Sequence, residues 1–370
     1  MFARKTKWLI AATAVIAAVA LAACGGDDDD DSGEDAPALS GDAAAATATP
    51  RTEPVDLRLG YFPNITHAPA LVGVKDGTFK QELGELVTLQ TKTFNAGPAV
   101  IEALFAGEID MSYIGPNPAI NGYVQSKGEA LRIVGGSTSA GALLVVRPEA
   151  NIASAKDFAN KKVATPQLGN TQDVALRAWL QENGLKAKEQ GGNVQVIPTE
   201  NATTLTLFQK GEIDGAWVPE PWATRLVQQA GGKVFLDEKS LWPEGKFVTT
   251  HIIVRTEYLE KNPDVVKDFL AANIKVIQAI NADPERAKTT TNDAIKEITN
   301  AALPKEVIDA AWQNLVFTWD PVANSLKTSA DNAYALGFLG LKKPDLANIY
   351  DLSLLDEVLN EQQLPDVKGF

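Results

Sequence analysis

Short runs rich in β-branched and aliphatic residues alternate along the chain with longer segments whose apolar residues recur at helical spacing. We expect strands at residues 57–61, 87–91, 111–114, 131–134, 162–164, 194–197 and 216–218, with helices between them. Strands that alternate with helices are typical of βα units. The pattern therefore predicts an α/β fold with mostly parallel sheets.

Two segments of the chain share one order of elements. Residues 87–119 and 194–223 each show a strand, a loop, a helix that contains Leu-Phe, the tetrapeptide Gly-Glu-Ile-Asp, a second strand and a proline-containing loop. Gly107 and Gly211 open the two tetrapeptides, and glycine suits the left-handed position that ends a helix. Any βαβ unit favours some of these residues, but the shared order indicates two lobes of similar design.

Two further β-rich runs, residues 142–146 and 250–254, mark where the chain would cross between the lobes. One lobe would then contain residues 55–143 and 250–370, and the other residues 144–249. Loops after the carboxyl ends of parallel strands hold the ligand in open α/β sheets. We therefore expect a ligand cleft between the lobes that closes by rotation about the two crossings.

Several segments resemble the solute-binding lipoproteins of ABC importers, in the family that includes taurine, aliphatic-sulfonate and nitrate binders. These segments are LRLGYFPNITHAPALVG from Leu57, FNAGPAVIEALFAGEIDMSYIGPNPAI from Phe94, LGNTQDVALRAWLQENGL from Leu168, GEIDGAWVPEPWATRL from Gly211 and LGFLGLKKPDLANIYDLSLL from Leu336. The resemblance implies two periplasmic-binding-protein-like lobes, a small anionic solute in the cleft, a monomer, and a permease in the membrane as partner. An organosulfonate, either an aliphatic sulfonate or taurine, is the first choice of solute. Nitrate, a pyrimidine-type thiamin precursor and a role as a tethered solute sensor remain alternatives.

Three predicted helix starts would point into the cleft. A helix N-terminus carries free N–H groups and the positive end of the helix dipole, so it can hold an anion without Lys or Arg. The candidate residues at these starts are Asn170 and Thr171, Asn117 before Pro118, and Gly97 with Pro98. Each residue alone is explained by helix capping, and their convergence is what favours a binding site.

Aromatic residues near the predicted strand ends would form apolar walls for a small ligand. Phe62 follows the first strand, and Trp217 and Trp222 flank a loop that Pro219 and Pro221 stiffen. Pro221 also suits the first position of a helix, where its missing N–H needs no partner. Core packing is the alternative for every aromatic side chain, and the stiff loop makes the two Trp residues the first candidates.

Glu220 lies in the same loop, between the two prolines. A carboxylate in the cleft repels a simple anion but would pair with the ammonium group of an amino-sulfonate. The alternative is a residue at a helix start that faces solvent. Asn64 and His67 in the first loop, and Ser139 near the outgoing crossing, are further polar candidates for the site.

The composition excludes several classes of protein. The chain has 34 basic and 47 acidic residues and a net charge of −13, which does not suit binding to nucleic acid. One Cys and two His cannot form a thiolate zinc site. No Gly-x-Ser-x-Gly, phosphate-loop or His-Glu-x-x-His motif is present. We therefore expect neither an enzyme nor a bound metal or cofactor.

The N-terminal part of the chain differs from the rest. Residues 1–23 combine basic residues with a short apolar run, which is typical of a secretory signal peptide. A membrane anchor is the alternative, but the run is shorter than the roughly 20 residues that span a bilayer. Residues 24–54 are acidic and poor in large apolar side chains, which predicts a disordered tether. Counted from Val55, 30 basic and 38 acidic residues leave a charge of −8.

Cys24 is the only cysteine of the chain. It ends the sequence Leu-Ala-Ala-Cys, which resembles the lipobox of bacterial lipoproteins, where the chain is cut before the cysteine and a diacylglyceryl group joins its sulfur. We therefore expect a lipid anchor at Cys24 that holds the protein on the extracytoplasmic face of the cell membrane.

Overall fold

The structure is a computed structural model that describes residues 51–369, all of which belong to one compact unit of the chain. The predicted signal peptide, Cys24 and most of the predicted tether lie outside the described residues. Among residues 51–369, no helix is both long enough and apolar enough to cross a membrane.

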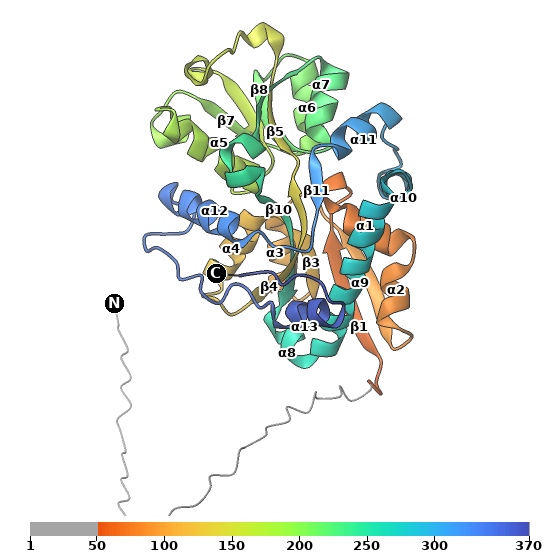
Figure 1. The fold of residues 1–370 in the computed structure, drawn as a ribbon. Helices are drawn as coiled ribbons and strands as arrows, with labels where there is room; N and C mark the ends of the chain where they lie inside the picture. Colours follow the sequence, from red (N-terminus) through yellow and green to blue (C-terminus); the bar gives the residue numbers. More distant parts are fainter. Residues whose placement is uncertain (1–50, 370) are drawn as a thin grey trace, which may run out of the picture. The chain divides into compact units, whose positions relative to one another are not determined.

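Six strands form the larger sheet, in the order β11-β4-β10-β3-β1-β2 (Figure 1). In chain order they are β1 (Val55–Tyr61), β2 (Val87–Thr93), β3 (Met111–Ile114), β4 (Leu131–Ala140), β10 (Val248–Arg255) and β11 (Leu315–Phe317). β1 pairs in parallel with β2 and β3. The pairs β10/β3, β10/β4 and β11/β4 are antiparallel.

Five strands form the smaller sheet, in the order β7-β6-β8-β5-β9. They are β5 (Ala142–Val146), β6 (Lys162–Thr165), β7 (Gln195–Pro198), β8 (Gly215–Pro219) and β9 (Lys233–Asp237). β6 pairs in parallel with β7 and β8, whereas β5 pairs antiparallel with β8 and β9. We call residues 55–140 and 248–369 the larger-sheet region, and residues 142–245 the smaller-sheet region.

The predicted α/β class and all seven predicted strands are confirmed. The expectation of mostly parallel sheets was wrong, because five of the nine strand pairings are antiparallel. An alternating βα pattern predicts parallel pairing only for strands joined by a helix. β4 instead continues through Gly141 directly into β5, which lies in the other sheet and runs antiparallel to both of its neighbours.

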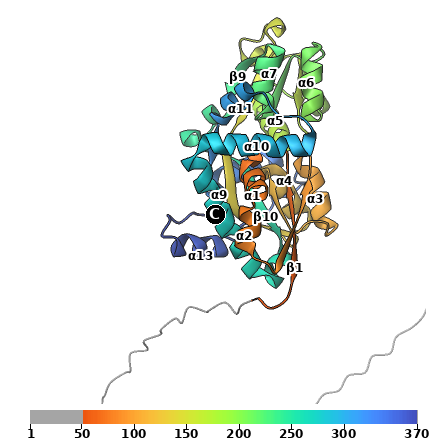
Figure 2. The same ribbon diagram turned by 90° about the vertical axis from the view of Figure 1, so that its right-hand side faces the viewer.

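Helices cover the larger sheet. They are η1 (Ile65–His67), α1 (Ala68–Lys75), α2 (Thr78–Leu83), α3 (Gly97–Phe105), α4 (Pro116–Gln125), α8 (Thr256–Lys261), α9 (Pro263–Ala282), α10 (Pro284–Thr299), α11 (Lys305–Trp312), α12 (Ala323–Ala335) and α13 (Ser353–Glu361). Figure 2 shows α10 lying beside α1 and α9. The smaller-sheet region contributes α5 (Thr171–Glu182), α6 (Asn201–Gln209), α7 (Trp222–Ala230), η2 (Pro148–Ala150), η3 (Ala155–Phe158), η4 (Lys188–Gln190), η5 (Glu238–Leu241) and η6 (Pro243–Gly245).

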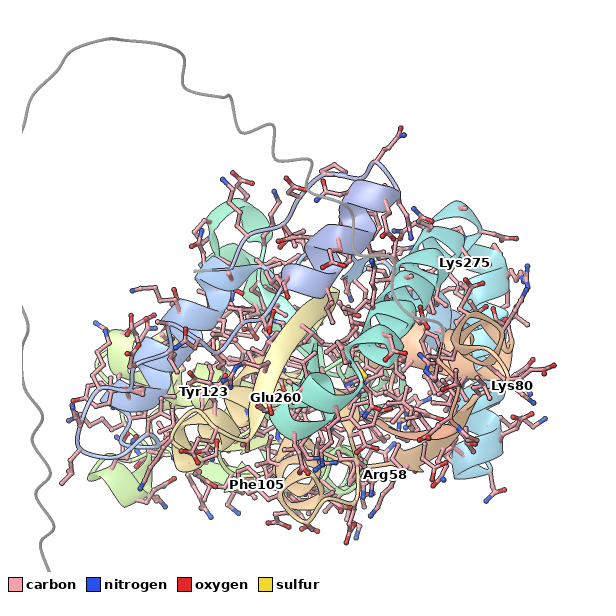
Figure 3. The ribbon with its side chains drawn as sticks, turned by 90° about the horizontal axis from the view of Figure 1, so that it is seen from below. Arg58, Lys80, Phe105, Tyr123, Glu260 and Lys275 are labelled. Atoms are coloured by element: carbon pink, nitrogen blue, oxygen red, sulfur yellow. The ribbon has the colours of Figure 1, made fainter. Side chains whose placement is uncertain are left out.

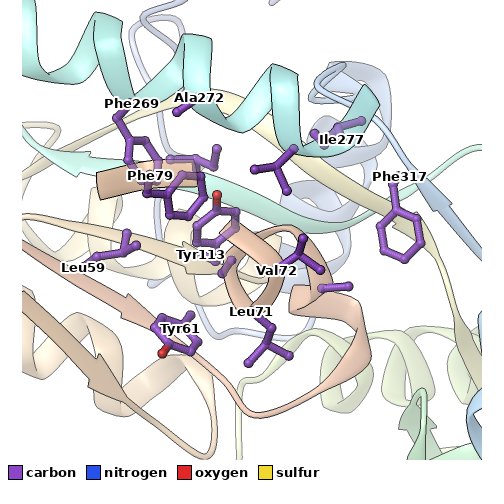
Figure 4. Close-up of a cluster of buried hydrophobic side chains, with 14 of the residues drawn as sticks. Leu59, Tyr61, Leu71, Val72, Phe79, Tyr113, Phe269, Ala272, Ile277 and Phe317 are labelled. Atoms are coloured by element: carbon purple, nitrogen blue, oxygen red, sulfur yellow. The ribbon is translucent and has the colours of Figure 1, made fainter. Parts of the chain in front are cut away.

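Successive residues of the central strands point into opposite hydrophobic clusters. Tyr113 and Ile252 belong to one cluster with α1, α2, α9 and α13, and Ile114 and Ile253 belong to another with α3, α4 and α12. Side chains alternate between the two faces of a strand, so the larger sheet is buried on both faces. Figure 4 shows part of the first cluster around Tyr113.

The smaller sheet follows the same rule. Leu144 and Trp217 lie in a cluster with α5, whereas the next residues, Val145 and Val218, lie in a cluster with α6 and α7. Helices of the two regions also touch: α12 packs against α5, and α11 packs against α7. The division into two moving lobes at residues 143/144 and 249/250 stays a prediction. The strands change sheet at Gly141 and before Val248.

Candidate functional site

A small cavity lies between the two regions, and we call it the inner cavity. It has a volume of about 30 Å³, room for roughly two water-sized groups. The larger-sheet region contributes Phe62, Asn64, Thr66, His67, Asn95, Gly115 and Thr249, and the smaller-sheet region contributes Asn170, Thr171, Gln172, Asn201 and Pro219. None of these lining residues is Lys, Arg, Asp or Glu, so the wall is polar without a formal charge.

Helix starts supply much of this polar wall. Gly115 is the N-cap of α4, Asn170 is the N-cap of α5, Asn201 is the first residue of α6, and Asn95 lies two residues before α3. At none of these four helices does the N-cap side chain bond the first turn. Amides of a first helical turn have no partner within the helix. The starts of α4, α5 and α6, where the helix dipoles are positive, therefore lie in the wall of the inner cavity, together with Asn95 just before α3.

Thr171 carries an unused hydrogen-bonding group into this cavity. Its side chain is only 6% exposed, and its Oγ1 is buried with no partner in the structure. The hydroxyl lies against Gly115 of the other region, where an added Cβ atom would be 2.5 Å from Oγ1. A buried hydroxyl without a partner costs free energy, so a bound acceptor at this point would be stabilised.

His67 is fully buried beside Phe62, with the two rings stacked 4.2 Å apart. Burial lowers the pKa of His67 to about 3, so the imidazole is neutral near pH 7. Nδ1 accepts a hydrogen bond from the backbone N–H of Phe62 at 3.3 Å. The proton of the neutral ring is therefore on Nε2, which makes His67 a hydrogen-bond donor rather than a cation.

A second cavity, of about 80 Å³, adjoins the first, and we call it the outer cavity. Four residues line both cavities: Phe62, Asn64, Asn95 and Asn201. The remaining lining residues are Pro63, Phe94, Glu200, Ala202 and Trp222. Asn95 Nδ2 donates to Glu200 Oε1 at 3.2 Å, so a hydrogen bond crosses between the two regions at this cavity.

Six of the twelve residues predicted to bind the ligand therefore line one of the two cavities: Phe62, Asn64, His67, Asn170, Thr171 and Trp222. Gly97 and Pro98 begin α3, close to Asn95 in the chain, but line neither cavity. The predicted N-cap at Asn170 is confirmed, because α5 begins at Thr171.

Asn117 and Ser139 lie elsewhere. α4 begins at Pro116, so Asn117 is its second residue rather than its N-cap. The side chain of Asn117 is buried and donates to the carbonyl of Ser329 at 3.2 Å. Ser139 is also buried, and its hydroxyl donates to the carbonyl of Phe247 at 2.7 Å. Both groups are used in packing the larger-sheet region.

Trp217 and Glu220 are both completely buried. Trp217 belongs to the hydrophobic cluster that includes α5, and its Nε1–H donates to Glu238 at 2.8 Å. Burial raises the pKa of Glu220 to about 6. Its carboxylate accepts the backbone N–H of Thr224 at 3.0 Å and Nδ2 of Asn314 at 2.6 Å. Glu220 thus caps α7, which begins at Trp222 rather than at Pro221, and it lines neither cavity.

Five of the lining residues that sequence reasoning missed could have been found from the internal repeat. Gly115 and Pro219 occupy the same position, eight residues after Gly107 and Gly211, and both line the inner cavity. Asn95, Glu200 and Asn201 flank the starts of the two repeated helices, α3 and α6. Thr66, Gln172 and Thr249 carry no comparable signal in the sequence.

A larger hollow of about 440 Å³ lies on the surface along α12. Its charged residues already pair with one another, since Asp331 accepts from both Lys327 and Lys343. Its one lining residue in the first turn of a helix is Asn324, the second residue of α12. Within residues 51–369, no group of three or more His, Cys, Asp or Glu side chains could hold a metal ion.

Similar proteins bind small solutes. The taurine-binding periplasmic protein of Escherichia coli K12 is 28% identical over 66% of this chain and 72% of its own length. Two solved structures share the fold: the alkanesulfonate-binding protein SsuA from Xanthomonas axonopodis pv. citri bound to MOPS, and the periplasmic nitrate-binding protein NrtA from Synechocystis PCC 6803.

The first structure has a TM-score of 0.67 at 18% identity and covers 81% of this chain and 99% of its own. The second has a TM-score of 0.70 at 16% identity and covers 86% of this chain and 92% of its own. The expected periplasmic-binding-protein-like fold is thereby confirmed, and the similar proteins are binding proteins rather than enzymes. The model of the NMT1-like family matches residues 51–294, and the chain therefore belongs to the NMT1-like family.

Proposed function

We propose that this protein binds a small oxyanion, an organosulfonate in the first place, between its two regions and delivers it to the permease of an ABC importer. The observation that carries the proposal is the inner cavity, where three helix starts and the unpartnered hydroxyl of Thr171 converge without any Lys or Arg. Helix N-termini hold sulfonate, sulfate-like and nitrate oxygens through backbone N–H groups.

The similar proteins support this choice of solute, because their names specify taurine, alkanesulfonates and nitrate. Nitrate is the second candidate, since the inner cavity of about 30 Å³ suits a very compact anion. A neutral donor set also explains how a chain with an overall negative charge attracts an anion, because the local field at the cavity comes from helix dipoles and hydroxyl groups.

The experiment is a thermal-shift screen of the purified full-length protein against alkanesulfonates, 2-aminoethanesulfonate (taurine), nitrate and a pyrimidine. A ligand that binds only the folded state at 100 times its dissociation constant adds about 2.7 kcal/mol to the free energy of unfolding. We expect a higher melting temperature with at least one oxyanion and none with the pyrimidine. The absence of any shift with the oxyanions would refute the proposal.

The proposed location is the extracytoplasmic face of the cell membrane, with Cys24 as the lipidated residue. The Leu-Ala-Ala-Cys sequence after an apolar run supports this part of the proposal. Cys24→Ser removes the only thiol of the chain. We expect this variant to move from the membrane fraction to the soluble fraction, and its retention in the membrane would point to a spanning anchor instead.

A further inference from the structure

The inner and outer cavities adjoin, since they share four lining residues, and we call the two together the chamber. The two ends of the chamber differ in chemistry. The inner end is walled by helix starts and hydroxyl groups, whereas the aromatic side chains of Phe94 and Trp222 line only the outer end, and Phe62 lines both. A solute that fills the chamber must have an oxyanion at one end and a different group at the other.

Glu200 is the only residue with a full charge among those that line the chamber. It precedes the first residue of α6, and its Oε1 already accepts a hydrogen bond from Asn95 Nδ2 at 3.2 Å. A carboxylate keeps acceptor capacity beyond one hydrogen bond, because its two oxygens offer about four lone-pair sites. Glu200 can therefore accept N–H donors from a bound group while the bond to Asn95 persists.

A carboxylate beside aromatic rings recognises an ammonium group. The carboxylate supplies a charge-assisted hydrogen bond, and the faces of Trp and Phe rings attract a cation through their quadrupole. The ring of Trp222 already takes part in one such contact, because the guanidinium of Arg225 lies 4.5 Å from its centroid. A bare anion would instead be repelled at this end of the chamber.

The size of the chamber limits the length of the solute. Volumes of about 30 and 80 Å³ correspond to roughly two and five water-sized groups. A solute with on the order of seven non-hydrogen atoms fills that space, whereas a long alkyl or aromatic sulfonate does not fit without separating the two regions.

From these observations, and resting on the proposed function, we infer that the solute is a short zwitterion, with its oxyanion at the Thr171 end and its ammonium group at Glu200. Glu200, rather than the buried Glu220, is then the residue that determines specificity for an aminated solute. The chemical class is a short ω-amino oxyanion, of which 2-aminoethanesulfonate is the probe that tests the inference.

The test measures dissociation constants of the full-length protein for 2-aminoethanesulfonate and for ethanesulfonate, which has the same length but no amine. A charge pair at an exposed carboxylate such as Glu200 corresponds to a preference for the aminated compound of about two- to fivefold. We expect this preference in the native protein and a ratio near one in Glu200→Gln. Glu212→Gln, which removes another exposed carboxylate from the smaller-sheet region, is the matched control and should keep the preference.

The possible outcomes separate the two proposals. If both sulfonates bind with equal affinity, or if Glu200→Gln weakens both equally, the role of Glu200 is refuted while the proposed function stands. If neither sulfonate nor nitrate binds, the proposed function fails and the inference fails with it. The melting temperature of Glu200→Gln without ligand shows whether the variant is folded, and urea unfolding gives a second measure of its stability.

Discussion

Asp110 in the larger-sheet region and Asp214 in the smaller-sheet region end the two Gly-Glu-Ile-Asp turns. Asp110 donates its N–H to the carbonyl of Arg58 and accepts the N–H of Arg58 on its carboxylate. Its own carbonyl accepts the N–H of Arg255. These three hydrogen bonds join the middle of β1 to the end of β10.

Asp214 makes the same three bonds with Lys162 and Arg147, and so joins the beginning of β6 to the end of β5. The surroundings of the two carboxylates differ. Asp110 is 1% exposed and accepts Arg58 Nη2 at 2.6 Å and Arg255 Nη2 at 2.9 Å. Arg58 can be seen from below in Figure 3. Asp214 is half-buried, and no ion pair holds it among residues 51–369.

The shared backbone hydrogen bonds explain why both positions are aspartate, and the degree of burial explains why only Asp110 is surrounded by cations. A carboxylate that is removed from water needs a paired cation, and Asp110 has two. Asp214 remains in contact with water and needs none. The shared tetrapeptide therefore marks a structural joint in each region rather than a ligand site.

The largest effect should come from Asp110→Asn. Removal of one partner from a buried ion pair costs roughly 3–5 kcal/mol, so we expect a loss of about 4 kcal/mol in the free energy of unfolding. Asp214→Asn is the matched control and should cost about 1 kcal/mol, the value of one hydrogen bond. Urea unfolding monitored by circular dichroism measures both. Equal losses would show that the backbone bonds, and not the ion pairs, dominate.

A second matched position concerns the strands that follow the turns. Tyr113 and Trp217 are both buried and lie six residues after Gly107 and Gly211. Tyr113 Oη donates to the amide oxygen of Asn273 at 2.8 Å, and Trp217 Nε1 donates to the carboxyl group of Glu238 at 2.8 Å. Only the second partner can titrate.

The next effect is a pH dependence carried by Glu238. Burial raises the pKa of Glu238 from 4.5 to about 7, so the folded protein retains a proton that the unfolded chain has lost. The stability that Glu238 contributes is therefore fully present below pH 4.5. It is lost as the pH rises to about 7, which lowers the free energy of unfolding by on the order of 3 kcal/mol. Glu238→Gln should remove this loss, and melting temperatures between pH 4 and 8 measure it.

Burial also raises the pKa of Glu220, to about 6, so the stability that Glu220 contributes is likewise lost as the pH rises. This contribution remains in the Glu238→Gln variant. The pKa of Asp110 has the opposite shift: burial alone would raise it, but hydrogen bonds from Arg58 and Arg255 lower it below 3.8. Stability from Asp110 is therefore present above pH 3.8 and lost as the pH falls further. A Glu238→Gln profile parallel to that of the native protein between pH 4.5 and 7 would contradict the assignment.

A smaller effect should appear at the matched positions Gly115 and Pro219, which line the inner cavity from opposite sides. Gly115→Ala places a methyl group 2.5 Å from Thr171 Oγ1, so the two regions cannot approach as closely. We expect oxyanion affinity to fall by about tenfold, or 1.4 kcal/mol, as measured by calorimetry. Pro219→Ala adds no atoms, so the oxyanion affinity of this variant should fall by less. If Pro219→Ala instead causes the larger loss of affinity, the tight contact lies on the Pro219 side of the cavity.

The smallest effect should come from Thr171→Val. The variant keeps the shape but removes the hydroxyl, and one hydrogen bond is worth about 1 kcal/mol, so affinity should fall by about fivefold. The hydroxyl of Thr249 also lines the cavity but is already donated to the carbonyl of Ala140. Thr249→Val should therefore lower the melting temperature more than the affinity, and a larger affinity loss there would make Thr249 the ligand donor.

The sequence predicts the strands and the N-cap at Asn170 because both depend on local pattern. It does not predict whether Trp217 faces the core or the cleft, since this depends on the register of the strand in the sheet. The role of Glu220 depends on the residue at which α7 begins. α4 starts at Pro116, whereas α7 starts at Trp222, two residues later in the repeat, and this shift turns a cleft candidate into a helix cap.

The division of the inner cavity between two regions has a consequence for release. α4 brings its N-terminus from the larger-sheet region, and α5 and α6 bring theirs from the smaller-sheet region. If the proposed function holds, each half offers only part of the attraction to the anion, and we expect high affinity only while the two halves are together. We then expect a partner that separates the halves to release the anion without a competing counter-ion, so that unloading needs no chemical step.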